Sequence, residues 1–312
     1  MYPLKLKPIY DKTIWANDVL TKARGIKEKG FGTCWEISAH PHAQNVILNK
    51  EYAGITLGEL IDLKPTEMLG KHPKEAMLRL AYLDAKEDLS IQVHPDEAYA
   101  KAHENDQGKC ESWYILEAKK GATLVAGTLS DDKEAIKKAI HEETLETYLR
   151  KVPMEAGDFI YIDAGMLHAL GGGILALEVG TNSNTTYRFY DYGRKDANGN
   201  GRELHLDKGF DVVGLNKRSE KVATPMQEGI EQKKVLEDGD AFKVTLYDIC
   251  GELKLDTEGY NFHCLSFVHN DAIVEYNEEE YEANYCENMF IPASCGKYKI
   301  KGNCRVLVSV TK

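Results

Sequence analysis

Short apolar segments separated by glycine-containing turns run through most of this 312-residue sequence, and strand-like segments do not alternate regularly with helical ones. Apolar and polar residues alternate in these segments with the period of two that is typical of β-strands. A parallel α/β sheet needs a helix between successive strands, so the pattern favours an antiparallel sandwich or barrel. The predicted strands are Ser90 to His94, Trp113 to Glu117, Ala122 to Ala126, Phe159 to Ile162, Ile174 to Val179 and Thr185 to Tyr192.

Helical spacing is less common than strand-like alternation. Apolar residues recur at the spacing of an amphipathic helix in Thr56 to Leu63, Pro73 to Leu80 and Asp131 to Ile140. Ser130 is the predicted N-cap of the third segment. These helices are interpreted as insertions into a mainly β protein.

A domain boundary is predicted near residue 235, just after a polar run that ends at Lys234. Beyond it the pattern is almost wholly strand-like up to Val310, interrupted by short glycine turns. At roughly 150 residues per domain, a chain of this length suits two domains. We therefore predict a larger domain over residues 1–235 and a smaller β domain over residues 236–312.

Charge and cysteine content restrict the partners and the compartment. Lys and Arg number 39 against 50 Asp and Glu, and the net charge of −11 argues against a nucleic-acid binder, which normally has a basic face. No window approaches the roughly 18 consecutive apolar residues of a membrane-spanning helix, and the first residues lack the apolar core of a signal peptide. The seven cysteines form no C-x-x-C pair, which favours reduced thiols. We expect a cytoplasmic protein without nucleic-acid or membrane partners.

Several polar residues are spaced so that their side chains meet in one cavity. The period of two places Gln92 and His94 on the same face of a strand. Glu111 opens a later apolar strand, with Lys109 two residues before it on the same expected face. His168 follows a further strand and a glycine turn, where its imidazole can also face inward.

Two imidazoles, one carboxylate and one amide oxygen form a mixed nitrogen and oxygen site. Such a site suits Zn²⁺ or another borderline divalent ion and leaves a coordination position open for substrate. A single buried histidine in a β-sandwich is more often a hydrogen-bonded core residue than a ligand. The joint spacing of Gln92, His94, Glu111 and His168 is what favours a metal site.

The segment Gly157 to His168 resembles the second motif of the cupin superfamily, and Gln92, His94 and the more distant Glu111 replace its first motif. This variant is similar to type I mannose-6-phosphate isomerases. The similarity extends over most of the first 220 residues, in the segments TCWEIS, QVHPDE, GKCESWYIL, AGMLHAL, NSNTTYRFYDYGR and GRELHLDKG. It implies a cupin-type antiparallel β-sandwich or jelly roll with helical insertions, followed by a second, smaller β domain.

The resemblance also implies the reaction and the roles of individual residues. Members of the family interconvert mannose 6-phosphate and fructose 6-phosphate by moving a proton between C1 and C2 through an enediolate. One divalent metal ion per subunit, usually zinc, would bind Gln92, His94, Glu111 and His168, and the resemblance places the family's active-site arginine at Arg188. Ser90 and Arg194 would bind the phosphate of the sugar. The protein is expected to be a monomer or a small homo-oligomer.

The base and the class of function have alternatives. Glu178 is the leading candidate for the proton-transfer base, with Lys109 as a second ionisable group. A non-catalytic sugar-binding relative would be expected to lose a metal ligand or the arginine, and this chain keeps both. A different cupin chemistry, such as an iron-dependent dioxygenase, is disfavoured because Gln92 stands where a third histidine would be expected.

Overall fold

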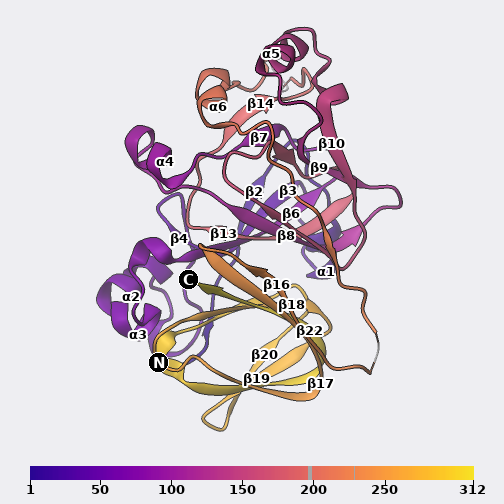
Figure 1. Cartoon of the computed structure of the whole chain (residues 1–312). Coiled ribbons are helices and arrows are strands. Elements are labelled where there is room, and N and C mark those ends of the chain that lie inside the picture. Colours follow the sequence, from indigo (N-terminus) through magenta and orange to yellow (C-terminus); the bar gives the residue numbers. More distant parts are fainter. Residues whose placement is uncertain (196–198, 228) are drawn as a thin grey trace.

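The chain folds into three stacked antiparallel sheets, which confirms the predicted mainly β architecture (Figure 1). The computed structural model describes residues 1–195, 199–227 and 229–312. A five-stranded and a seven-stranded sheet form a sandwich in the first two thirds of the chain, and an eight-stranded sheet packs beneath the seven-stranded one. The seven-stranded sheet is therefore the middle layer.

Both sheets of the sandwich mix strands from distant parts of the sequence. The middle sheet has the order β15 (Val222–Ala223), β11 (Asp158–Ile162), β8 (Glu111–Ala118), β13 (Ile174–Thr181), β6 (Leu78–Ala85), β3 (Phe31–Ile37) and β2 (Ile9–Lys12). The upper sheet has the order β10 (Leu149–Pro153), β9 (Thr123–Thr128), β12 (His168–Ala169), β7 (Ile91–Val93) and β14 (Tyr187–Tyr190). The apolar layer between the two sheets includes Trp113, Ile115, Leu124, Ala126, Ile160 and Ala176.

The lower sheet is built mainly from the C-terminal part of the chain. Its strands are β1 (Leu4–Lys5), β21 (Asn288–Ile291), β18 (His263–His269), β22 (Lys297–Thr311), β17 (Phe242–Asp256) and β16 (Gln232–Asp238), with β19 (Ala272–Tyr276) and β20 (Glu279–Ala283) at one end. β16 crosses residue 235 and pairs with β17. The first strand of the chain also pairs within the lower sheet, where Leu4 lies opposite Phe290. The division of the chain into domains near residue 235 stays a proposal.

A buried arginine joins the lower and middle sheets. Arg305 is 2% exposed and donates to both carboxylate oxygens of Asp248, at 2.6 and 2.7 Å. It also donates to the Tyr114 hydroxyl (3.0 Å) and the Thr224 carbonyl (2.6 Å). Tyr114 belongs to β8, whose opposite face carries Glu111, so the lower sheet supports the strand that carries the predicted site.

The helices lie around the sheets, as predicted for insertions. They are α1 (Val19–Ala23), α2 (Leu57–Leu63), α3 (Pro65–Leu69), α4 (Glu97–His103), α5 (Lys133–His141) and α6 (Leu206–Val212). Short 3₁₀ turns occur at Lys50–Tyr52, Lys74–Ala76, Leu145–Tyr148 and Ala293–Cys295. The two-residue strands β4 (Ala39–His40) and β5 (Ala43–Gln44) pair with each other. None of the helices in the described part of the chain is long and apolar enough to span a membrane.

Two helix predictions are confirmed. α2 starts after Thr56, whose hydroxyl accepts from the Glu59 amide while the Glu59 carboxylate accepts from the Thr56 amide. α5 packs with α6 on the outer face of the upper sheet (Figure 1). Its N-cap is Asp132 instead of Ser130, and the Asp132 carboxylate accepts from two backbone amides of the first turn.

The predicted helix over Pro73 to Leu80 is wrong. A 3₁₀ turn covers Lys74–Ala76, and the following apolar residues start β6. All eight residues of β6 are buried because the strand lies between β3 and β13 in the middle sheet, with the upper sheet on one face and the lower sheet on the other. A strand buried on both faces loses the polar and apolar alternation, so its sequence resembles that of a buried helix.

Candidate metal centre and active site

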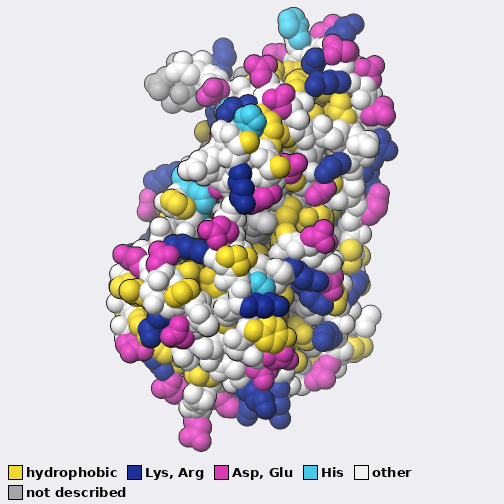
Figure 2. Space-filling view, turned by 60° about the vertical axis from the view of Figure 1, so that its left-hand side comes forward, with side chains coloured by type: hydrophobic (Ala, Val, Ile, Leu, Met, Phe, Trp, Pro, Cys, Tyr) yellow, Lys and Arg dark blue, Asp and Glu magenta, His cyan; other side chains and the backbone are white. Residues whose placement is uncertain are grey.

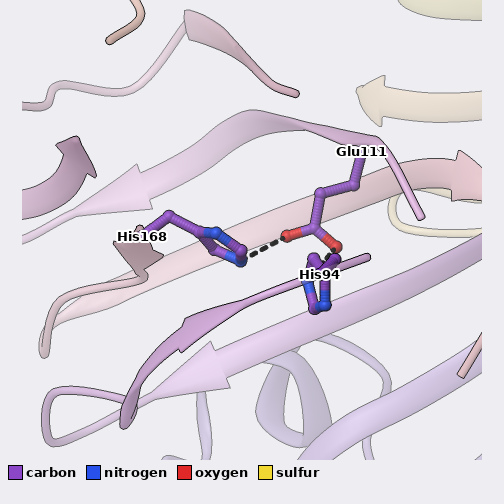
Figure 3. Close-up of side chains that lie close together, drawn as sticks. All are labelled: His94, Glu111 and His168. Carbon is purple, nitrogen blue, oxygen red and sulfur yellow. Dashed lines mark ion pairs between the residues drawn. The ribbon is translucent and has the colours of Figure 1, made fainter. Parts of the chain in front are cut away.

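Three potential metal ligands meet between the upper and middle sheets. His94 follows β7, Glu111 opens β8 and His168 opens β12 (Figure 3). Each offers a ligand atom, and these atoms all lie within 4.8 Å of one another. His168 Nε2 is 3.3 Å from Glu111 Oε1, and His94 Nε2 is 3.5 Å from Glu111 Oε2. All three side chains are buried.

The strand register places Gln92 beside this cluster. Gln92 lies directly opposite His168 on one neighbouring strand and Arg188 on the other. Directly opposed residues project from the same face of a sheet, so the three side chains form a row on the inner face of the upper sheet. The amide Nε2 of Gln92 is 3.4 Å from His168 Nε2, and a half-turn of the amide would direct its oxygen there instead.

Backbone carbonyls orient both imidazoles. His94 Nδ1 lies 3.0 Å from the Thr185 carbonyl oxygen, and His168 Nδ1 lies 2.8 Å from that of Met166. A carbonyl can only accept, so each Nδ1 carries a proton, and the Nε2 that faces Glu111 is the atom by which a neutral imidazole would bind a cation. Burial, with a contribution from the Lys109 charge, lowers the pKa of His94 to about 3. His94 is therefore neutral near pH 7, as a metal ligand must be.

The cluster has the unsatisfied polar atoms expected around a cation. Glu111 Oε1, Glu111 Oε2 and His94 Nε2 are buried and accept no hydrogen bond from the described residues, although Lys109 forms an ion pair with Oε2. Burial raises the pKa of Glu111, but the positive charge around it, chiefly that of Lys109, outweighs burial and holds the pKa well below its usual value. A buried carboxylate facing two imidazole lone pairs is a donor set that fits a divalent ion of zinc type.

Two further ionisable side chains from the predicted site adjoin the cluster. Lys109 Nζ lies 2.5 Å from Glu111 Oε2 and 3.5 Å from Glu178 Oε1. Glu178 also pairs with Arg79, a residue that the sequence analysis did not identify. Lys109, Glu178 and Arg79 are each 5% exposed or less. One further buried carboxylate and two buried cations thus lie beside the cluster.

The predicted phosphate contacts lie near the far end of the row. Asp191 accepts from Arg194 and from Arg202, whose Nε is 2.7 Å from Asp191 Oδ2. Arg194 also donates to the Asp88 carbonyl oxygen (2.6 Å). Ser90 is buried and immediately precedes β7. Arg202 was missed because it stands beyond the predicted strand pair, in a segment without a periodic pattern.

Arg188 is the last residue of the row that begins with His168 and Gln92. It is half-buried, and its Nη1 donates to the Glu203 carbonyl oxygen (2.8 Å). Its Nε is buried without a hydrogen-bond partner among the described residues. Arg194 and Arg202 lie close enough for their charges to act on Arg188. Elsewhere on the surface, the face shown in Figure 2 has acidic and basic side chains interspersed.

The fold and this site define a mainly β, cupin-type protein with a buried metal-capable centre. The model for the type I phosphomannose isomerase catalytic domain matches residues 4–128, and the model for the mannose-6-phosphate isomerase cupin domain matches residues 231–311. The chain belongs to the family of type I mannose-6-phosphate isomerases and is an enzyme of the isomerase class.

Three relatives illustrate this similarity over the full length. A probable mannose-6-phosphate isomerase of Bacillus subtilis is 35% identical over 99% of each chain. The crystal structure of the mannose 6-phosphate isomerase from Bacillus subtilis superimposes with a TM-score of 0.89 at 32% identity, covering 99% of each chain. A zinc-bound mannose 6-phosphate isomerase shares the fold, with a TM-score of 0.75 at 17% identity over 100% of each chain.

Proposed function

We propose that the enzyme interconverts mannose 6-phosphate and fructose 6-phosphate, with one zinc ion held by Gln92, His94, Glu111 and His168. The family supports the substrates. The observation that carries the metal is the set of buried lone pairs on His94 and Glu111 that accept no hydrogen bond from the described residues. Without a cation among them, only the Lys109 ammonium would compensate for the lost hydration of these atoms.

The metal would supply Lewis-acid polarisation of the sugar oxygens at C1 and C2. Arg188 adds a fixed positive charge from the same face of the sheet as Gln92. Its buried Nε has no partner among the described residues and is a free donor for a sugar oxygen. Preorganised donors of this kind stabilise the charge of an enediolate more effectively than water does.

Proton transfer is assigned to Glu178. In the direction from aldose to ketose, its carboxylate takes the proton from C2 of open-chain mannose 6-phosphate, and the C2 to C1 enediolate forms. The same carboxyl group returns the proton to C1, while the hydroxyl proton of O2 is transferred to O1. Lys109, between Glu178 and Glu111, is the alternative base and otherwise stabilises the two carboxylates.

Phosphate binding is assigned to Ser90 and Arg194, with Arg202 beside them. Asp191 holds both guanidinium groups through charge-assisted hydrogen bonds. Two cations around one aspartate leave a local positive charge in a protein whose net charge is −11. A sugar phosphate dianion would be attracted to this part of the surface.

The proposal is tested with a coupled assay for fructose 6-phosphate formation from mannose 6-phosphate. The wild type is compared with His168→Ala and with His141→Ala, which changes an exposed histidine of α5. Turnover by the wild type and His141→Ala, with loss in His168→Ala, is the expected result. Full activity of His168→Ala would exclude the metal assignment, and no turnover by any form would exclude the substrate.

A further inference from the structure

Arg79 is a buried cation on the inner face of the middle sheet. Its residue is 3% exposed, and its guanidinium carbon lies 4.7 Å from the ring centroid of Trp35. In the strand register Arg79 is opposite Gly180, which is in turn opposite Glu111. Arg79 and Glu111 therefore lie on one face, two strands apart, with no side chain between them.

The guanidinium binds only one oxygen of Glu178. Arg79 Nη2 pairs with Glu178 Oε1, and Lys109 Nζ is 3.5 Å from the same oxygen. Oε2 of Glu178 accepts no hydrogen bond from the described residues. Both cations thus hold the carboxylate by one oxygen, and the second oxygen is available to a ligand.

The second amino group of the guanidinium, Nη1, binds the segment 182–185, which follows β13. Arg79 Nη1 donates to the Ser183 carbonyl oxygen and lies 3.4 Å from Asn184 Oδ1. Asp106 binds the same segment, and its carboxylate accepts from the Thr185 hydroxyl at 2.7 Å. The carbonyl of Thr185 is the group that orients His94.

Arg79 therefore contacts both the proposed base, Glu178, and the segment whose Thr185 carbonyl orients His94. A guanidinium group can make both contacts at once because its donors form a rigid planar fork. Stacking on Trp35 fixes the plane of that fork. A lysine at this position could supply the charge but not both contacts.

We propose that Arg79 is a positioning residue for proton transfer: it fixes Oε1 of Glu178 so that Oε2 faces C1 and C2 of the sugar. This inference rests on the proposed function. The proton moves between carbon and Oε2, and Arg79 neither gains nor loses one. Without Arg79 the carboxylate could rotate toward Lys109, and fewer bound substrates would be in a reactive geometry.

The test compares Arg79→Ala and Arg79→Lys with the wild type on ordinary mannose 6-phosphate and on the sugar deuterated at C2. Arg150→Ala is the control, because Arg150 is also hydrogen-bonded to a backbone carbonyl, but on β10, away from the site. Arg79→Ala should lower kcat roughly 100-fold and change KM by less than about threefold, since positioning acts mainly on the chemical step. The deuterium isotope effect on kcat should increase, because proton transfer becomes rate-limiting.

Added guanidinium chloride supplies a second readout. Millimolar guanidinium should restore part of kcat in Arg79→Ala and none in Arg79→Ala combined with Glu178→Gln. A merely structural role would lower the active fraction and leave the isotope effect unchanged, and this result would overturn the inference. Should Arg79→Ala not fold, an unchanged isotope effect in Arg79→Lys would overturn it equally.

Failure of the inference and failure of the proposed function are distinguishable. An active wild type with an equally active Arg79→Ala would remove the positioning role and leave the isomerase assignment intact. A wild type that turns over neither sugar phosphate would remove the function itself.

Discussion

Gln92 lies directly opposite Arg188 in the antiparallel pair of β7 and β14, so their side chains share one face of the upper sheet. On its other side Gln92 is opposite His168. A single row across three strands thus joins two proposed metal ligands to the arginine proposed to stabilise the enediolate. Neighbouring side chains in this row are separated by the spacing of the strands, which is about 5 Å per step.

Replacing Glu111 by glutamine should remove the metal. The substitution keeps the shape of the side chain but removes the only carboxylate of the cluster. Zinc affinity is expected to fall at least 100-fold, judged against the 10- to 100-fold effect of outer-shell partners. Zinc per chain after dialysis against a weak chelator measures this. Glu117→Gln, an exposed position on the same strand, should retain its zinc, and equal retention by Glu111→Gln would contradict the ligand assignment.

Gly180→Ala should displace the Glu111 carboxylate while leaving the Glu111 side chain itself unchanged. A Cβ at residue 180 would lie 2.9 Å from the Cys110 carbonyl oxygen and 3.2 Å from the Cβ of Glu111. We expect β8 to shift, with a loss of about 1 to 3 kcal/mol of stability and weaker zinc binding. Gly239→Ala, which meets only the flexible end of Glu237, is the control. Urea unfolding and zinc titration of both variants test the prediction, and matching results would count against it.

Arg305→Ala should destabilise the whole chain. It removes one partner of a buried ion pair with Asp248 and leaves the Tyr114 hydroxyl and Thr224 carbonyl without their donor. The free energy of unfolding should fall by about 3 to 5 kcal/mol. Lys243→Ala removes a partly exposed pair with Asp238 and should change it by less than about 1 kcal/mol. A fall of under 1 kcal/mol for Arg305→Ala would show that Arg305, through its hydrogen bonds to Tyr114 and Thr224, does not hold the lower and middle sheets together.

The pH dependence of stability should include a contribution from Asp84. Burial raises the pKa of Asp84 to about 6, although the Leu20 amide donates to its carboxylate. The folded state therefore binds the proton more tightly than the unfolded state, and the stabilisation present below about pH 4 is lost as the pH rises through 6. A shift of about 2 units corresponds to roughly 3 kcal/mol. Asp84→Asn should remove this decline between pH 4 and 6, whereas Asp62→Asn, an exposed control, should keep it. Parallel pH curves for the wild type and Asp84→Asn would refute the assignment.

The parts of the site that could be predicted from the sequence depend on local periodicity. Alternation predicted that Gln92 and His94 share one face and that Lys109 and Glu111 share another, and a strand followed by a glycine turn predicted that His168 faces inward. Arg79 could not be found in this way. It lies in β6, where burial on both faces hides the strand pattern, and its partners Glu178 and Ser183 are about a hundred residues away.

Long-range pairing explains the remaining differences. The pairing of Leu4 with Phe290 joins the two ends of the chain and has no local signature. The N-cap of α5 is Asp132, although Ser130 was predicted. Both residue types are favoured at an N-cap, so the sequence does not show at which of the two the helix begins. Local chemistry thus specified elements and ligand faces, whereas register and layer order depended on contacts across the whole chain.

The most direct test of the central claim is a zinc titration of the chelator-stripped enzyme, with fructose 6-phosphate formation measured at each addition. We expect no turnover without metal, a linear rise with added zinc, and a break at one zinc per chain. A stripped protein with full activity, or one that binds a stoichiometric zinc and still turns over neither sugar phosphate, would contradict it.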